Sequence, residues 1–189
     1  METKILGRTN LEVPIIGLGA MFIGSSETEA PIDLNEDLGA QTVLAALEAG
    51  CTLIDTAPVY GGTTSETFIG RVLKERPDLA SECTVVTKVG SQRGHKDYSY
   101  DAVMQNVEDS QKRLGIETFA FLCIHDAMGH PMEEVMAKDG ALGALRKLQA
   151  EGVVRFVGSA MNDPHTNAPY IETGEFDVAV IPNAWSLLN

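Results

Sequence analysis

Four residues of types that can move protons stand where apolar runs of the sequence end: Asp55, Tyr60, Lys88 and His125. Three of them lie at or next to the end of separate runs rich in Val, Ile and Leu, and Tyr60 follows Asp55 after a turn that contains a proline. An ammonium group beside a tyrosine lowers the pKa of the phenol from its usual value of about 10, and a carboxylate keeps that ammonium charged. The set is therefore typical of a proton donor, with His125 orienting the acceptor or relaying the proton.

Each of these residues also has a purely structural explanation. An aspartate at a strand end often caps a turn, a lone lysine is usually solvated, and a lone tyrosine or histidine is more often a packing residue. The structural explanation needs four coincidences, whereas one site explains all four residues at once. A tyrosine that protonates a carbonyl oxygen needs a partner that attacks the carbon, and a nicotinamide hydride fits that role.

The elements that would position these residues alternate between strands and helices. The expected strands are 15–19, 52–55, 84–89, 118–124, 153–159 and 177–181. The expected helices are 37–49, 65–75, 99–114, 140–151 and 162–172. Because the strands are continuous apolar runs, they predict a parallel sheet that is buried on both faces. A (β/α)8 barrel and a doubly wound sheet both fit, although Gly17-Leu18-Gly19 is not followed by the rest of the dinucleotide-binding fingerprint.

Composition limits the class of protein. The chain has 189 residues, the size of one domain, and 44% of them are hydrophobic, which is enough for a core. The formal net charge of −13 argues against nucleic acid and anionic membrane as partners. We expect no membrane span or export signal, since no apolar run approaches roughly 18 residues and the N-terminus lacks an apolar stretch. The cysteines at 51, 83 and 123 show no metal-binding spacing, which predicts reduced thiols in a cytoplasmic protein.

Three segments resemble the signature segments of the aldo-keto reductase superfamily. They are Asp-Thr-Ala-Pro-Val-Tyr-Gly (55–61), Thr-Lys-Val-Gly (87–90) and Ile-His-Asp (124–126). The resemblance implies a (β/α)8 TIM barrel that uses NADP or NAD without a metal and acts on a small carbonyl or sugar substrate. Within the superfamily the chain looks most similar to the sugar-lactol (aldose) and pyridoxal dehydrogenases. Residues 4–14 are similar to the family's N-terminal β-hairpin, which plugs the bottom of the barrel.

The resemblance also implies roles for individual residues. The catalytic tetrad falls on Asp55, Tyr60, Lys88 and His125, with Tyr60 as the general acid. The cofactor contacts fall on Gly19, Ala20, Met21, Asp55, Ser159, Asn162 and Trp185. Either Ser159 or Asn162 would bind the nicotinamide carboxamide, and Trp185 stands where the related dehydrogenases usually carry a tyrosine.

The length of the chain departs from the family pattern. The family has eight βα units, and the sequence 1–189 reads as a single partial barrel domain of about six units. Phosphate sites of TIM barrels generally lie on the loops after strands seven and eight, so most of the dinucleotide site would be missing. Truncation, self-association through the open barrel edges and loss of catalysis each explain this length.

Two other functions compete with the oxidoreductase hypothesis. A non-catalytic nucleotide-binding or regulatory barrel would explain the missing part of the cofactor site. A metal-dependent barrel would use His125, Asp126 and Asp55, but no His-x-His or paired carboxylates support a metal. The sequence decides neither the substrate nor the choice between NADP and NAD, and the acidic segment 27–37 is either a border of the substrate entrance or a solvated linker.

Overall fold

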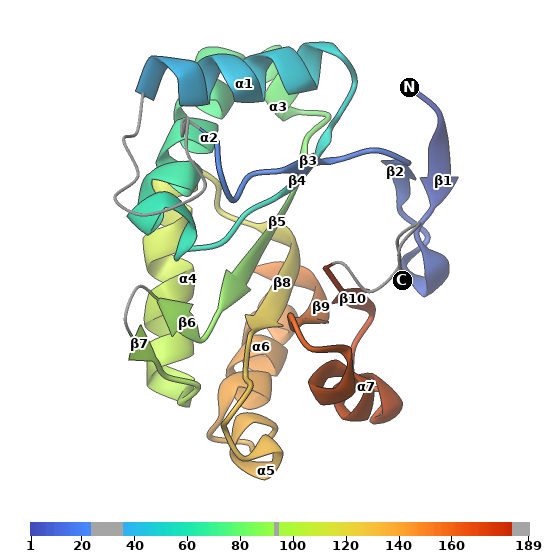
Figure 1. Ribbon diagram of the computed structural model, residues 1–189, viewed down its shortest axis with the longest axis vertical. Helices are drawn as coiled ribbons and strands as arrows, with labels where there is room; N and C mark the ends of the chain where they lie inside the picture. The colour runs from blue at the N-terminus through green and yellow to red at the C-terminus, as the bar shows by residue number, and fades with distance from the viewer. Residues whose placement is uncertain (24–35, 93–94, 183–189) are drawn as a thin grey trace.

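The computed structural model describes residues 1–23, 36–92 and 95–182 and shows a curled, six-stranded parallel sheet (Figure 1). In chain order the strands are β3 (Leu18–Gly19), β4 (Leu53–Asp55), β5 (Thr84–Val89), β8 (Phe119–His125), β9 (Val154–Ala160) and β10 (Val178–Val180). The long helices are α1 (Glu36–Glu48), α2 (Thr64–Glu75), α4 (Tyr100–Leu114), α6 (Ala141–Ala150) and α7 (Pro164–Glu172). Each strand pairs with its neighbours in chain order, which is the arrangement of a partial (β/α)8 barrel and confirms the expected fold.

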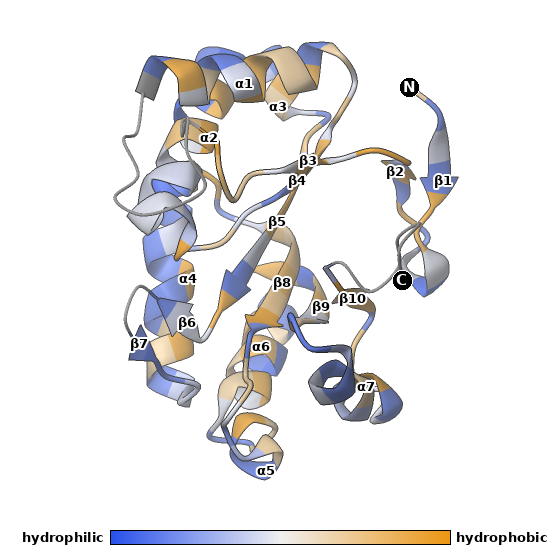
Figure 2. Ribbon diagram, viewed as in Figure 1, coloured by the Kyte–Doolittle hydropathy of each residue, from blue (hydrophilic) through white to orange (hydrophobic). Residues whose placement is uncertain are grey.

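Alternation along the strands separates two apolar layers. In β8, Leu122 and Ile124 belong to the large core under the helices, whereas Phe121 and Cys123 belong to a second cluster on the inner, concave side. Because successive side chains of a strand point to opposite faces, His125 continues the inner row. The helices α1, α2, α4 and α6 lie on the other side of the sheet (Figure 1). In Figure 2, β8 is apolar along most of its length, while β5 becomes hydrophilic toward its C-terminal end.

Helix α2 packs unusually close to the end of α4. A Cβ added at Gly70 would stand 2.1 Å from the carbonyl oxygen of Arg113 and 2.9 Å from the backbone of Leu114. Only a glycine permits this approach. The two helices are therefore held at a fixed distance behind β5, which carries one of the candidate site residues.

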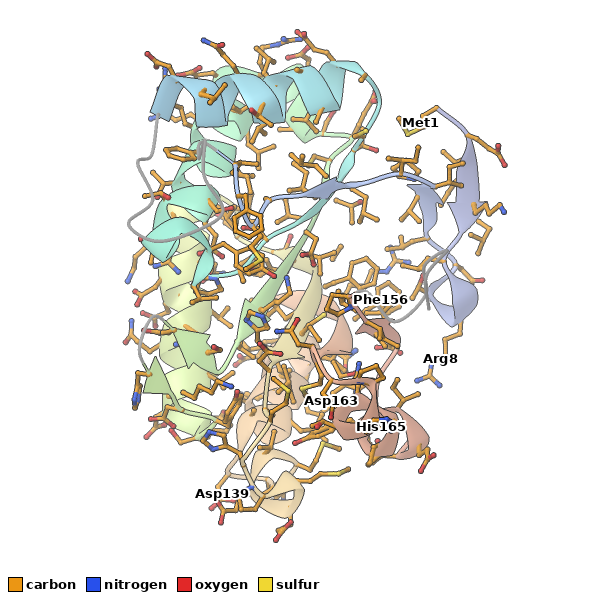
Figure 3. The ribbon with its side chains drawn as sticks, viewed as in Figure 1. Met1, Arg8, Asp139, Phe156, Asp163 and His165 are labelled. Carbon is orange, nitrogen blue, oxygen red and sulfur yellow. The ribbon has the colours of Figure 1, made fainter. Side chains whose placement is uncertain are left out.

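The N-terminal hairpin lies on the side of the sheet opposite these helices (Figure 1). It consists of β1 (Thr3–Ile5) and β2 (Glu12–Pro14), and its Leu6 and Leu11 pack against the inner cluster of the sheet. Arg8 reaches from the hairpin toward the side of α7 (Figure 3), donates to the carbonyl oxygens of Gly174 (3.1 Å) and Phe176, and stands 3.6 Å from Asp177. That this hairpin closes the bottom of a barrel stays a prediction.

The structure differs from the expected elements at the N-terminal strand and in several short segments. Of the strand expected at 15–19, only Leu18 and Gly19 pair with the sheet, because Ile15 and Ile16 continue out of the hairpin and are exposed. Unexpected elements are the short helices α3 (Pro77–Ala80) and α5 (Met132–Val135) and the hairpin of β6 (Ser91–Gln92) with β7 (His95–Lys96).

The two edge strands of the sheet are β3 and β10, each paired on one side among the described residues. Association of two copies through these edges remains a prediction. Within the part of the chain that the structure describes, every helix is too short or too polar to cross a membrane.

Candidate active site

The ends of three adjacent strands bring the predicted tetrad together. Asp55 ends β4, Lys88 lies one residue before the end of β5, and His125 ends β8. Tyr60 begins the next element after β4, the 3-10 turn η2 (Tyr60–Thr63). In a parallel sheet these ends share one edge, so side chains that are far apart in sequence converge there.

Lys88 is the most completely bound charge of the site. Its side chain is 2% exposed, and its Nζ lies 2.9 Å from both carboxylate oxygens of Asp55 and 2.7 Å from the carbonyl oxygen of Thr56. Burial, the largest single effect, lowers the pKa of Lys88, but the charge and hydrogen bond of Asp55 together with the neighbouring Tyr60 outweigh it, and the net pKa is raised. Three acceptors match the three N–H donors of an ammonium, so Lys88 acts on Tyr60 mainly through its charge.

Tyr60 lies against this ammonium. The Lys88 Nζ is 4.7 Å from the centre of the Tyr60 ring. Burial raises the pKa of Tyr60, and the charge of Lys88 lowers it by less, so the net change is upward. The sequence-based expectation of a lowered pKa was therefore wrong, because it counted the neighbouring charge and not the loss of solvent. At neutral pH Tyr60 is a protonated phenol.

His125 faces the edge of Tyr60, with ring centres 5.8 Å apart and planes at 85°. The residue is 7% exposed, and its Nδ1 has no hydrogen-bond partner among the described residues. Burial, and then the charge of Lys88, lower its pKa to about 4. His125 is therefore a neutral imidazole at neutral pH, able to donate a hydrogen bond to a substrate oxygen but not to act as an imidazolium acid.

The loop after β3, which the family resemblance predicts to contact the cofactor, lies beside Asp55. Gly19 pairs with Asp55 in the sheet, and the Ala20 N–H donates to the Asp55 carbonyl oxygen at 2.8 Å. Met21 is 50% exposed. Described atoms leave open the space where a Cβ of Gly19 would stand, so a flat ligand can approach this backbone.

A buried hydroxyl pair connects this loop to Lys88, and the sequence analysis missed it. Ser65 Oγ donates to the carbonyl oxygen of Ala20 at 2.9 Å and lies 2.8 Å from Thr56 Oγ1. The Thr56 carbonyl is itself an acceptor for Lys88. Ser65 was expected only as the start of a helix. No sequence pattern shows that its hydroxyl bonds to a loop 45 residues away.

The remaining predicted cofactor residues differ in accessibility. Ser159 is completely buried, and its Oγ has no partner among the described residues. Its neighbour Ala160 belongs to the inner cluster, so the alternation of β9 directs Ser159 toward the helices, which argues against the predicted carboxamide contact. Asn162 is exposed and donates to Asp126 through its N–H (2.9 Å) and its Nδ2 (2.7 Å). Trp185 lies outside the described residues.

Comparison with known proteins identifies the family. The model of the Aldo/keto reductase family matches residues 15–189. The chain belongs to this family. L-galactose dehydrogenase from Arabidopsis thaliana is 34% identical over 84% of this chain and 48% of its own length. Pyridoxal 4-dehydrogenase from Microbacterium luteolum is 28% identical over 100% of this chain and 64% of its own.

A solved structure supports the same conclusion about the fold. The glycerol dehydrogenase from Gluconobacter oxydans superimposes with a TM-score of 0.72 at 28% identity, over 95% of this chain and 54% of that one. The similarity to L-galactose dehydrogenase and to pyridoxal 4-dehydrogenase agrees with the predicted branch of sugar-lactol and pyridoxal dehydrogenases. The chain spans about half to two thirds of the length of the relatives it matches.

Proposed function

We propose that this aldo/keto reductase chain carries the proton-transfer half of an NAD(P)-dependent oxidoreductase, in which Tyr60 is the general acid and base. The substrate would be a small aldehyde or ketone, or a sugar lactol. The protein would act in the cytoplasm. The observation that carries the proposal is the buried Lys88, which is bound to Asp55 and lies 4.7 Å from the ring of Tyr60, at a rim shared with His125. A solely structural ion pair has no need of a phenol and a neutral imidazole beside it.

The residues next to Asp55 fit a nicotinamide. The open backbone at Gly19 and the exposed Met21 leave room for a flat ring at the edge of the tetrad. When bound, a dihydronicotinamide supplies a hydride, which is two electrons and a hydrogen nucleus. The enzymes of the family use NAD(P)H, and which of the two this chain prefers is a matter for direct titration.

The proton balance follows from the tetrad. In reduction, the carbonyl carbon gains the hydride, its C=O π bond breaks, and the oxygen takes the phenolic proton of Tyr60. The phenolate left on Tyr60 is stabilised by the charge of Lys88, and it recovers a proton from solvent. His125, neutral at neutral pH, donates a hydrogen bond that holds the carbonyl oxygen toward Tyr60. Oxidation of an alcohol runs the same steps in reverse and needs the phenolate.

A sugar substrate is the first choice for the test, since L-galactose dehydrogenase is 34% identical to this chain. The purified chain is titrated with NADH and NADPH while the fluorescence of Trp185, its one tryptophan, is followed. We expect saturable quenching, and then turnover with members of a panel of aldehydes, ketones and sugar lactols.

The decisive variant is Tyr60→Phe, with Tyr100→Phe as the matched control, because the Tyr100 hydroxyl bonds to no described residue. Loss of the general acid should lower kcat by about 10²–10⁴-fold, whereas the control should keep it. Turnover of Tyr60→Phe within a few-fold of the parent would refute the role of Tyr60. A folded chain that binds NAD(P)H and turns over no carbonyl would favour the non-catalytic nucleotide-binding alternative.

A further inference from the structure

The turn that follows His125 has an unusual backbone. Asp126 has φ +47°, in the left-handed region that residues other than glycine seldom adopt. Such a conformation persists only where its surroundings determine it, and it is often found at functional sites.

Backbone groups of this turn are bound by neighbouring loops. The carbonyl oxygen of His125 accepts from Tyr98 Oη at 2.6 Å, and that of Asp126 accepts from Lys96 Nζ at 2.6 Å. The Asp126 N–H donates to the carbonyl oxygen of Ala160 at 2.8 Å. The donors come from the segment after β5, and the acceptor from the end of β9.

The carboxylate of Asp126 is bound as well. Its two oxygens accept from the N–H and the Nδ2 of Asn162, at 2.9 and 2.7 Å. An aspartate that is held by both a main-chain and a side-chain donor has little freedom to rotate. The turn is therefore held from the β5 side and from the β9 side at once.

Tyr98 contacts the ends of both strands that carry Lys88 and His125. It is 6% exposed, and its ring lies edge-on to His130 with centres 4.7 Å apart. A Cβ added at Gly90, which follows the end of β5, would stand 2.3 Å from the Tyr98 ring. The ring thus packs against the end of β5, while the hydroxyl binds the end of β8.

We propose that Tyr98 and Asn162 are positioning residues for His125. By holding the strained Asp126 turn from opposite sides, they fix the imidazole against Tyr60 without contacting the reacting atoms. The catalytic meaning of this arrangement rests on the proposed function, but the arrangement itself does not. Loss of the Tyr98 hydroxyl would leave the His125 carbonyl buried without its donor, and the turn would relax.

The experiment follows the imidazoles of the four histidines by NMR in histidine-labelled parent chain, Tyr98→Phe and Tyr100→Phe. The His125 signal is assigned from its absence in His125→Gln. Tyr98→Phe keeps the ring contact with His130 and removes only the hydrogen bond to the His125 carbonyl. Because the turn then relaxes, we expect the His125 signal to shift and its titration midpoint to rise toward the ordinary value of about 6.5. In Tyr100→Phe neither changes.

The charged groups that act on the His125 ring are Lys88, Asp126 and Lys96, and these variants leave all of them in place. Asn162→Ala removes an exposed, uncharged donor and tests the same turn if Tyr98→Phe does not fold. We expect its His125 signal to move in the same direction by a smaller amount. His125 signals that match the parent in folded Tyr98→Phe, or in Asn162→Ala, would overturn the proposal.

A second readout uses catalysis where turnover is measurable. A displaced imidazole should lower kcat roughly tenfold in Tyr98→Phe and leave KM nearly unchanged, because the hydroxyl does not touch substrate. An absence of turnover in the parent chain as well as in the variants, with the His125 signal still displaced in Tyr98→Phe, would refute the proposed function and leave the positioning role supported.

Discussion

Strand β5 contacts two ion pairs, one on each face of the sheet, and the pairs differ in what surrounds them. On the inner face, Lys88 binds Asp55. On the helix face, the next residue back, Thr87, donates to Glu66 at 2.7 Å, and Glu66 also accepts from Arg113 at 2.7 Å. Adjacent residues of one strand thus contact two carboxylates on opposite sides of the sheet.

The carboxylates differ in exposure and in their neighbours. Glu66 is 0% exposed, and each of its oxygens has a donor, Thr87 or Arg113. The Asp55 side chain is 31% exposed, at the rim where Tyr60 and His125 have shifted pKa values. A buried and fully bonded carboxylate stabilises the packing of helices. A partly open one beside a phenol and an imidazole can take part in chemistry.

The largest effect on stability should come from breaking the helix-face pair. Arg113→Met leaves the buried Glu66 without its cation, which should cost about 3–5 kcal/mol of unfolding free energy. Turnover per folded molecule should not change. Urea denaturation measures the loss. Arg71→Met is the control, since its pairs with Glu75 and Asp37 are exposed and screened by solvent, so their loss should change stability little. Equal losses of unfolding free energy in Arg113→Met and Arg71→Met would contradict the distinction between a buried and an exposed ion pair.

Breaking the inner pair should act on catalysis instead. Lys88→Met removes the charge that stabilises the Tyr60 phenolate, and kcat should fall by about 10²–10³-fold. Asp55 can be solvated in this variant, so the unfolding free energy should fall by less than in Arg113→Met. Kinetics and urea denaturation on the same preparations test both expectations. A Lys88→Met chain that keeps its kcat would show that the two pairs have the same, structural role.

The inner face should also make stability depend on pH. The pKa of His125 is lowered from 6.5 to about 4 in the folded chain, so the unfolded chain binds the proton more readily. This contribution to stability is complete above pH 6.5 and is lost as the pH falls toward 4, by about 3 kcal/mol. His125→Gln should lack it. If the free energies of unfolding of the parent chain and His125→Gln changed in parallel between pH 7 and 4, a buried neutral His125 would be excluded.

The sequence predicts the inner face better than the helix face, for a physical reason. Asp55, Lys88 and His125 each lie at a strand end, and the parallel sheet brings strand ends to one edge whatever the details of packing. Glu66 and Arg113 lie on two helices 47 residues apart. In sequence they look like solvated helix charges, since the burial of Glu66 depends on how closely α2 and α4 approach.

Three other features that the sequence did not predict also depend on packing between distant segments. The raised pKa of Tyr60, the burial of Ser159 and the bond from Tyr98 to His125 all depend on which side chains exclude water from which atoms. Residue types and spacing predict the positions of these residues along a strand or loop. They do not predict how deeply a side chain is buried, because burial is decided by neighbours that are distant in sequence.

The contact of Arg8 has a consequence for folding during synthesis. Every strand of the main sheet pairs with the one made just before it, so the sheet can grow as the ribosome delivers each unit. The carbonyl of Phe176, which Arg8 binds, is made 168 residues later. The hairpin is thus made before β3 but finds this partner only after β9, and until then Leu6 and Leu11 have only part of the surface they finally cover.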